Sequence, residues 1–231
     1  MPTKTNEIET SKIRAEIEEH VISTLEEHNK ERQNSMSYYP NGIKKDSGIY
    51  NANKQKVGYW KYYYKNGTID REGLYIGNQK QGVWKEYTDQ GKLSYEIPYV
   101  NDLENGLMIS YSHDTIDALM NIKDGLRHGL FQTFHENGAL FQEVQMVNGH
   151  EHGVLKSFHP DGSLRQLSEY DMGKAIGTIK EYHPNGQIAR IGSYKNGAQD
   201  GDFKYYNENG KLTAIETFEN DFMSNYIEYE E

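Results

Sequence analysis

The sequence predicts an all-β protein, an elongated and twisted single-layer solenoid of stacked β-hairpins with an N-terminal α-helix. Three observations predict this fold. Glycines recur every 23 or 24 residues, at positions 58, 82, 106, 129, 153, 177 and 201. Asn-Gly pairs separate short apolar and aromatic runs, which is typical of hairpins. Tyrosine, with 19 copies, outnumbers the other aromatic residues, and a ring whose hydroxyl stays in water suits a thin sheet.

The composition excludes several classes of protein. The 231 residues are only 35% apolar, carry a net charge of -10 and contain no cysteine. So few apolar residues cannot fill one thick core, and the missing thiols exclude disulfides, thiolate metal sites and cysteine nucleophiles. The polar start of the chain and the lack of a run of ~20 apolar residues predict a cytoplasmic protein without membrane insertion. The acidic charge disfavours nucleic acid and predicts a basic protein partner.

Residues 1–35 are predicted to form an acidic amphipathic helix. Residues 6–34 contain neither glycine nor proline, and Ile13, Ile17, Val21 and Leu25 recur at helical spacing. Two interpretations stay open for this helix. It covers the first strand edge, which would otherwise promote aggregation, or it docks on a partner or on a second copy of the chain.

The remaining chain is predicted to consist of repeats. Residues 36–57 form a degenerate first repeat, residues 58–224 form seven repeats of 23–24 residues, and residues 225–231 form a capping strand with an acidic tail. In six of the seven repeats a second glycine follows nine residues after the first, where we expect a type I′ turn. The repeat that starts at Gly106 is one residue short and lacks the turn glycine, so we expect an irregularity there.

Each leading glycine is followed by an apolar residue two positions later and by an aromatic residue five positions later. The even spacing along the second strand puts another large residue on one face, for example at Tyr75, Tyr99, Tyr170 and Tyr194. These residues form the predicted repeat core. Its first-strand members are Trp60, Trp84, Phe131, Phe203, Tyr63, Tyr87, Tyr111, Phe134, Phe158, Tyr182 and Tyr206.

The predicted partner-binding surface uses the position four residues after each leading glycine, because this position varies between repeats. Variation inside a strict repeat is what a recognition surface needs. The residues are Tyr62, Glu86, Ser110, Thr133, Ser157, Glu181 and Tyr205. Lysines at 61, 85, 156, 180 and 204 form a row that is expected to pair with carboxylates on neighbouring strands. The alternative is that this row follows an anionic strand.

No catalytic, metal-binding or cofactor-binding residues are predicted, because nearly every candidate group recurs once per repeat. His135, His159 and His183 occupy the same repeat position. The segment His150-Glu151-His152 could place two imidazoles on one face, but it lacks a third ligand and is interpreted as a polar turn. Neither a nucleophile elbow nor a phosphate-binding glycine loop is present. The sequence therefore predicts a protein that is not an enzyme.

The recurring core Gly-x-Trp-Lys-x-Tyr-x-x-Asn-Gly-x-Leu, seen in residues 58–69 and 201–212, resembles the bacterial variant of the MORN repeat over roughly residues 37–229. In bacteria such arrays are characteristic of the YwqK-type family of antitoxin or immunity components. The resemblance implies a non-catalytic protein that sequesters a toxin. Eukaryotic MORN arrays are similar and are associated with membrane proximity and scaffolding, so the alternative is a structural scaffold or assembly subunit of a multiprotein complex.

Overall fold

The computed structural model describes residues 32–229, which form strands joined by loops and turns. The predicted N-terminal helix lies outside the described residues, except for its last four residues, 32–35. Of these, residues 33–35 are part of a strand that begins at Gln33, so the helix prediction was too long at this end. Within the described residues, no helix has the length and the hydropathy that crossing a membrane requires.

The chain divides into two compact units. Unit 1 contains the described residues up to Asp114 together with Ile122–Gly125, and unit 2 contains Thr115–Asn121 and the residues from Leu126 onward. Strand β9 (Thr115–Lys123) is shared between them. The strands of unit 1 are β1 (Gln33–Tyr38), β2 (Lys44–Tyr50), β3 (Lys56–Tyr63), β4 (Ile69–Ile76), β5 (Gln79–Tyr87), β6 (Leu93–Val100), β7 (Leu103–Glu104) and β8 (Gly106–Ser112). The strands of unit 2 are β10 (Leu126–Phe134), β11 (Leu140–Val147), β12 (His150–Phe158), β13 (Leu164–Asp171), β14 (Lys174–Tyr182), β15 (Ile188–Lys195), β16 (Ala198–Gln199), β17 (Gly201–Tyr206), β18 (Leu212–Glu219) and β19 (Phe222–Glu228).

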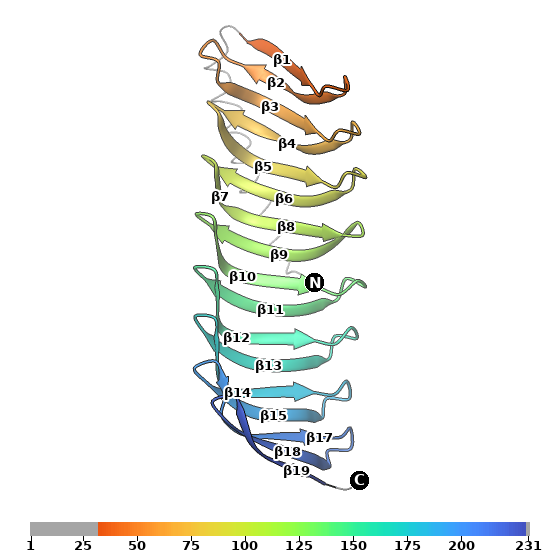
Figure 1. Cartoon of the computed structure of the whole chain (residues 1–231), viewed down its shortest axis with the longest axis vertical. Coiled ribbons are helices and arrows are strands. Elements are labelled where there is room, and N and C mark those ends of the chain that lie inside the picture. The colour runs from red at the N-terminus through yellow and green to blue at the C-terminus, as the bar shows by residue number, and fades with distance from the viewer. Residues whose placement is uncertain (1–31, 230–231) are drawn as a thin grey trace. The chain divides into compact units, whose positions relative to one another are not determined.

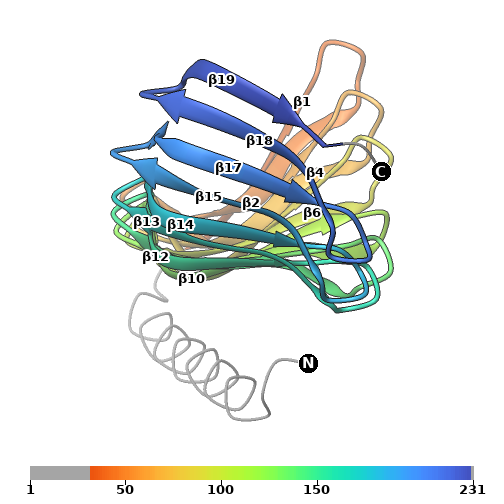
Figure 2. The same cartoon turned by 90° about the horizontal axis from the view of Figure 1, so that it is seen from below.

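Within each unit the strands form antiparallel hairpins that stack in chain order (Figure 1). The longer loops lie along one side of a unit and the tight turns along the other. Figure 2 shows the hairpins of unit 2 one above another. The predicted all-β fold of stacked hairpins in an open sheet is thus confirmed.

The Asn-Gly loops differ from the type I′ turns that the sequence predicts. In the loop after β3, the Gly67 N–H donates to the Tyr64 carbonyl at 3.0 Å, and the Tyr64 N–H donates to the Thr68 carbonyl at 2.8 Å. Gly67 has a φ of 91°, whereas Asn66 does not have a positive φ. This pattern is a three-residue loop, a type I turn followed by a left-handed glycine, so the type I′ prediction was wrong here.

Two-residue turns with positive φ at both positions occur at the opposite ends of the hairpins. An example is Asn148-Gly149, with φ values of 49° and 87°. The shortened repeat uses such a turn in place of an Asn-Gly loop, since His113 and Asp114 have φ values of 51° and 64°. The predicted irregularity is therefore present, and the two units divide directly after it.

Five of the Asn-Gly and Asp-Gly loops are bonded to the next hairpin beside its loop. The Tyr64 hydroxyl donates to the Tyr87 carbonyl at 2.7 Å, and His159 Nε2 bonds to the Tyr182 carbonyl at 2.9 Å from the same repeat position. Asn66 Nδ2 also donates across the loops, to the Asp89 carbonyl at 2.8 Å. The repeated histidines and tyrosines therefore have a structural role in holding successive hairpins in register.

A bulge at the leading glycine turns the next ring over the preceding hairpin. Between β4 and β5, Glu72 pairs with Lys85 and Leu74 pairs with Gln81, so that Gly73 alone faces residues 82–84. Gly82 makes this bulge at a φ of 66°, a conformation that glycine adopts without strain. As a result the fully buried ring of Trp84 lies directly on Gly73.

The contact between this ring and the strand below leaves no room for a side chain. A Cβ at Gly73 would lie 2.3 Å from Trp84, and the pairs Gly48/Trp60 and Gly192/Phe203 are equally close at 2.2 Å. The hairpins without an aromatic ring at this position carry a larger residue in place of the glycine. These pairs are Ile97 with Met108, Val144 with Leu155, and Ser168 with Ile179.

The rings of Trp60, Trp84 and Phe203 also lie edge-on between two second-strand rings. Trp84 is 4.9 Å from Tyr75 and 6.4 Å from Tyr99, with interplanar angles of 78° and 80°. Trp60 lies in the same way between Tyr50 and Tyr75, and Phe203 lies between Tyr194 and Phe218. T-shaped geometry is favourable for aromatic pairs. We call this position, above the glycine and between two second-strand rings, the ring seat.

The predicted core residues fall into two groups. Trp60, Trp84 and Phe203 occupy ring seats and are buried, while Phe131 packs partly buried against the cluster of Val144, Met146 and Leu155. The aromatic residues five positions after each leading glycine are half-buried, which agrees with their place beside the loops. They are Tyr63, Tyr87, Tyr111, Phe134, Phe158, Tyr182 and Tyr206.

Gly73→Ala should destabilise the protein by about 1–3 kcal/mol, because the added methyl group overlaps the Trp84 ring. Adding Trp84→Met should recover part of this loss, since Ile97 with Met108 shows that a larger residue can face a methionine. Urea denaturation of the two single variants and the double variant measures the coupling. If the stability losses of the two single variants simply add in the double variant, Trp84 does not depend on the space above Gly73, which would contradict the ring seat.

His159→Phe should cost about 1 kcal/mol, because the Tyr182 carbonyl loses its donor. His159→Tyr should cost less than half as much, since Tyr39 and Tyr64 make the same bond from the same repeat position. The midpoints of thermal unfolding measure both effects. Equal losses would argue against the loop-to-loop hydrogen bond as the cause.

Candidate functional site

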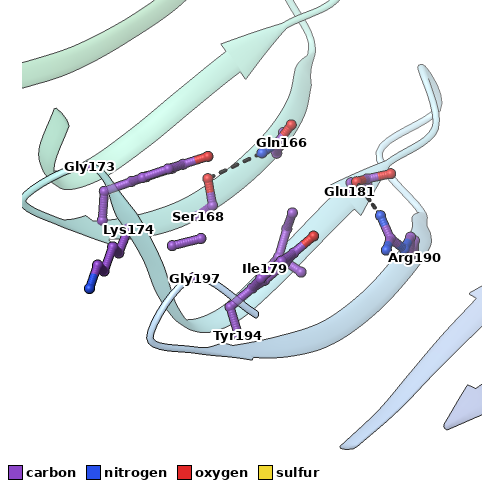
Figure 3. A pocket seen from close by; sticks show the side chains of 11 residues that line it. Gln166, Ser168, Gly173, Lys174, Ile179, Glu181, Arg190, Tyr194 and Gly197 are labelled. Carbon is purple, nitrogen blue, oxygen red and sulfur yellow. Dashed lines mark hydrogen bonds and ion pairs between the residues drawn. The ribbon is translucent and has the colours of Figure 1, made fainter. Parts of the chain in front are cut away.

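Unit 2 contains a recess of ≈ 480 Å³ that lies over strands β13, β14 and β15 (Figure 3). Figure 3 shows Gln166 and Ser168 facing the hollow from β13, and Ile179 and Tyr194 facing it from β14 and β15. The remaining lining residues are Tyr170, Gly173, Lys174, Ala175, Glu181, Arg190 and Gly197.

The recess is a ring seat without a ring. Its side walls are the second-strand rings Tyr170 and Tyr194, and Ser168 stands where glycine underlies Trp84 in unit 1. Ile179 occupies the position of that tryptophan, but an isoleucine side chain is too short to fill the space between two rings. We call this position, lined by Ser168, Tyr170, Ala175, Ile179 and Tyr194, the open seat.

The open seat also lacks the lysine that covers the two filled seats of unit 1. In unit 1, Lys80 lies two residues before its leading glycine, and its Nζ is 4.8 Å from the Trp84 ring centroid and 4.3 Å from that of Tyr99. Burial lowers the pKa of Lys80. Lys56 covers Trp60 in the same way at 4.7 Å. The equivalent residue in the open seat is Ala175, whose methyl group leaves the mouth uncovered.

An ion pair closes one end of the open seat. Arg190 Nη1 donates to Glu181 Oε1 at 3.1 Å, and the guanidinium lies 4.6 Å from the Phe203 ring centroid. Burial alone would lower the pKa of Arg190, but Tyr205 and Glu181 outweigh it and the pKa is raised. The guanidinium therefore stays charged beside the Glu181 carboxyl group. The Glu181 side chain is 35% exposed, so the carboxylate remains within reach of a ligand.

Strand β13 adds polar groups to the recess, with Gln166 paired directly with Glu181. Gln166 Nε2 donates to Ser168 Oγ at 3.1 Å, and burial raises the pKa of the Tyr170 hydroxyl. Tyr170 is therefore neutral at ordinary pH. The site thus combines two aromatic walls and an aliphatic centre with hydrogen-bonding groups at its edges, which is the usual composition of a binding pocket.

The predicted partner-binding residues are spread over both units. Tyr62, Glu86 and Ser110 belong to unit 1, and Thr133, Ser157, Glu181 and Tyr205 belong to unit 2. Ser110 and Ser157 are buried, with exposures of 6% and 3%, and the other five are half-buried. Of the seven, Glu181 lines the recess.

Sequence reasoning missed the residues that make the open seat. A signal was present, because Ile179 and Ala175 interrupt the pattern of ring and lysine set by Trp60 with Lys56 and Trp84 with Lys80. The importance of that pattern becomes clear from the packing of the rings and lysines in unit 1.

The recurring histidines of the described residues bond to backbone carbonyls. His135, His159 and His183 bond through Nε2 to carbonyls of the next hairpin at 2.8–2.9 Å. The segment 150–152 lies in strand β12 and not in a turn, which corrects the prediction, and His152 Nδ1 is 3.3 Å from Asp171 Oδ1. Over residues 32–229 there is no cluster of three or more His, Asp or Glu side chains that could hold a metal ion.

The lysine row pairs with carboxylates on neighbouring strands in part, as predicted. Lys61 Nζ lies 2.8 Å from Glu72 Oε2, and Lys85 and Lys156 are paired with Glu96 and Glu143. Burial raises the pKa of Glu72, but hydrogen bonds from Lys61 and Tyr87 outweigh it, and the pKa is lowered. The paired lysines are thus neutralised locally, which weakens the alternative that they follow an anionic strand.

A second accessible surface is strand β19, in which all seven residues are exposed. Phe222 is 74% exposed, and Met223, Tyr226 and Ile227 add further apolar area. The strand includes most of the predicted capping segment and begins three residues earlier than the prediction, at Phe222. Exposed apolar surface of this kind is common where proteins bind one another.

Glu181→Lys should destabilise unit 2 by about 1–3 kcal/mol, because it places a second cation beside the half-buried Arg190. Glu181→Gln should cost less than half of that, since its amide oxygen can still accept the Arg190 hydrogen bond. Chemical denaturation compares the two variants. Equal stability of the lysine variant and the unchanged protein would mean that the ion pair contributes nothing.

The sequence matches the model of one protein family, the MORN repeat variant. The matched residues are 56–76, 80–101, 127–148, 151–172, 176–196 and 199–220, which leaves the shortened repeat unmatched. The search of curated proteins found no match.

Two similar solved structures are the crystal structures of TcdB2-TccC3-Cdc42 and TcdB2-TccC3, at 13% and 14% identity and a TM-score of 0.25. The matches cover 82% and 85% of this chain but only 11% and 12% of those chains, so the likeness carries no further argument. Because the repeats found cover more than half of its residues, the chain belongs to the MORN repeat variant family.

Proposed function

We propose that this protein is a non-catalytic repeat protein that binds another protein, and most specifically an antitoxin or immunity protein that sequesters a toxin. The observation that carries the binding role is the open seat, a preformed recess with aromatic walls. At its end Arg190 and Glu181 form an ion pair in which each charge has its partner. A recess of this kind offers shape and apolar area to a ligand.

The polar groups of the repeat support a binding role over a catalytic one. The recurring histidines bond to backbone carbonyls, and Glu181 bonds to Arg190, so these groups are engaged in holding the hairpins. Membership of the MORN repeat variant family favours the same role, because such repeat proteins bind proteins or membranes and are usually not enzymes.

The antitoxin role is supported by the bacterial form of the repeat and by the charge of the chain. With a net charge of -10, the protein attracts a basic partner and repels anionic surfaces. The alternative function is a structural scaffold or assembly subunit, which the exposed apolar strand β19 would serve. The two functions differ in their partner, a single basic toxic protein or a multiprotein complex.

The test is to co-express this protein with the product of the neighbouring gene and to follow growth, then to measure the purified pair by surface plasmon resonance. If the neighbour is a basic toxin, growth arrest should be relieved by co-expression. The association rate should fall by about tenfold or more as the Debye length decreases from ~30 Å to ~8 Å.

Two charge-reversal variants, Glu136→Lys and Glu208→Lys, separate the effect of charge from that of stability. Both residues are exposed and lie in loops outside the ring seats. These variants should slow association and leave the unfolding midpoint unchanged, since exposed charges contribute little to stability. Recovery of a multiprotein complex without growth rescue would favour the scaffold. Turnover of a small substrate by the protein alone would overturn the proposal.

A further inference from the structure

We propose that the open seat of unit 2 binds a tyrosine side chain of the protein partner, so that the partner's ring stands between Tyr170 and Tyr194 as the Trp84 ring stands between Tyr75 and Tyr99 within unit 1. The inference rests on the proposed protein-binding function and adds the chemistry of the partner at one site. Its starting point is that the same chain shows both the filled and the unfilled form of one seat.

The filled seats define the kind of group that fits. In each of them a flat ring stands edge-on between two rings, at centroid distances of 4.9–6.4 Å. Tyr170 and Tyr194 form the same two walls in the open seat, and Tyr194 already makes this contact with Phe203 on its other side at 5.7 Å. The walls are therefore placed for a ring before any ligand arrives.

Three replacements in one repeat decide the space available. Ile179 replaces the ring, Ala175 replaces the covering lysine, and Ser168 replaces the glycine below the ring. Two of them remove volume, whereas the serine adds one small side chain that keeps an inserted ring nearer the mouth. The ring of a partner thus enters from the solvent side and packs on Ile179. In unit 1 the corresponding space is filled by Trp84 of the chain itself.

The end of the seat favours a ring that carries a hydroxyl. Glu181 Oε1 accepts from Arg190, and its carboxylate is partly exposed at the recess, so its other oxygen can accept from a phenol. The chain uses this pairing elsewhere, since the Tyr87 hydroxyl donates to Glu72 at 2.8 Å and the Tyr205 hydroxyl donates to Glu216. Phenylalanine would fill the seat without this bond, and leucine would lack the ring.

The first measurement uses N-acetyl-tyrosinamide as the probe and methyl NMR spectra of the full chain as the readout. The Ile179 δ1 and Ala175 β methyl signals should shift on titration, because a ring placed over them changes their local field. N-acetyl-phenylalaninamide should bind roughly two- to tenfold more weakly, and N-acetyl-leucinamide more weakly still. Equal shifts with all three probes, or none with the tyrosine probe, would overturn the proposal.

The matched control fills the seat from within. Ser168→Gly with Ile179→Trp recreates the pair that Gly73 and Trp84 form, and should remove the binding of the tyrosine probe. Ala175→Lys restores the covering lysine and should also block the probe, which provides a second test if the double variant folds poorly. Undiminished binding of the probe to both variants would place it outside the open seat and contradict the proposal.

Measurements with the natural partner distinguish a failure of the tyrosine proposal from a failure of the proposed protein-binding function. If the partner inserts a tyrosine, its dissociation should accelerate by tenfold or more with both blocked variants, and with replacement of that tyrosine by alanine. A partner that binds the blocked variants as tightly as the unchanged protein would overturn the tyrosine proposal while leaving the protein-binding function intact. Failure of the function itself would be seen as the lack of any stable protein partner.

Discussion

The packing of one side chain over the strand of the preceding hairpin is the constraint on which both units depend. A bulge at the leading glycine turns Trp84 onto Gly73, and there is no space for a Cβ between them. Each hairpin is thereby held on the one before it by a buried contact. Tight packing of this kind supplies much of the stability of a sheet that lacks a covering layer. The loop-to-loop hydrogen bonds of Tyr64 and His159 hold the opposite edge in the same register.

The candidate site follows from a local departure from this constraint. Most hairpins balance the two positions, with a glycine under a ring or a larger residue under an aliphatic one. In the pair of Ser168 and Ile179 the serine adds less volume than Ile97 or Val144 does in the other aliphatic pairs, and the rings on either side remain in place. The recess therefore has the shape of a missing ring, and binding there requires no change in the fold. A preformed site of this kind loses little free energy to ordering on binding.

Much of the fold could be predicted from the sequence because it depends on spacing. The glycine period and the Asn-Gly pairs predict the hairpins, and the two tryptophans mark the core. The turn type could not be predicted from the dipeptide, since Asn66-Gly67 closes a three-residue loop and Asn148-Gly149 a two-residue turn. The open seat could not be recognised because its walls come from two successive hairpins. The burial of Ser157 was missed because, in a single sheet, the face that binds is also the face that packs.

The most direct test of this account is a crystal structure of the variant that combines Ser168→Gly and Ile179→Trp. The account predicts that the introduced indole lies on the new glycine, edge-on between Tyr170 and Tyr194, at centroid distances within the 4.9–6.4 Å found in the filled seats. The recess should then be closed, with the strands around it unchanged. An indole turned into solvent, or strands β13 and β14 displaced to accommodate it, would contradict the claim that the recess is a ring seat.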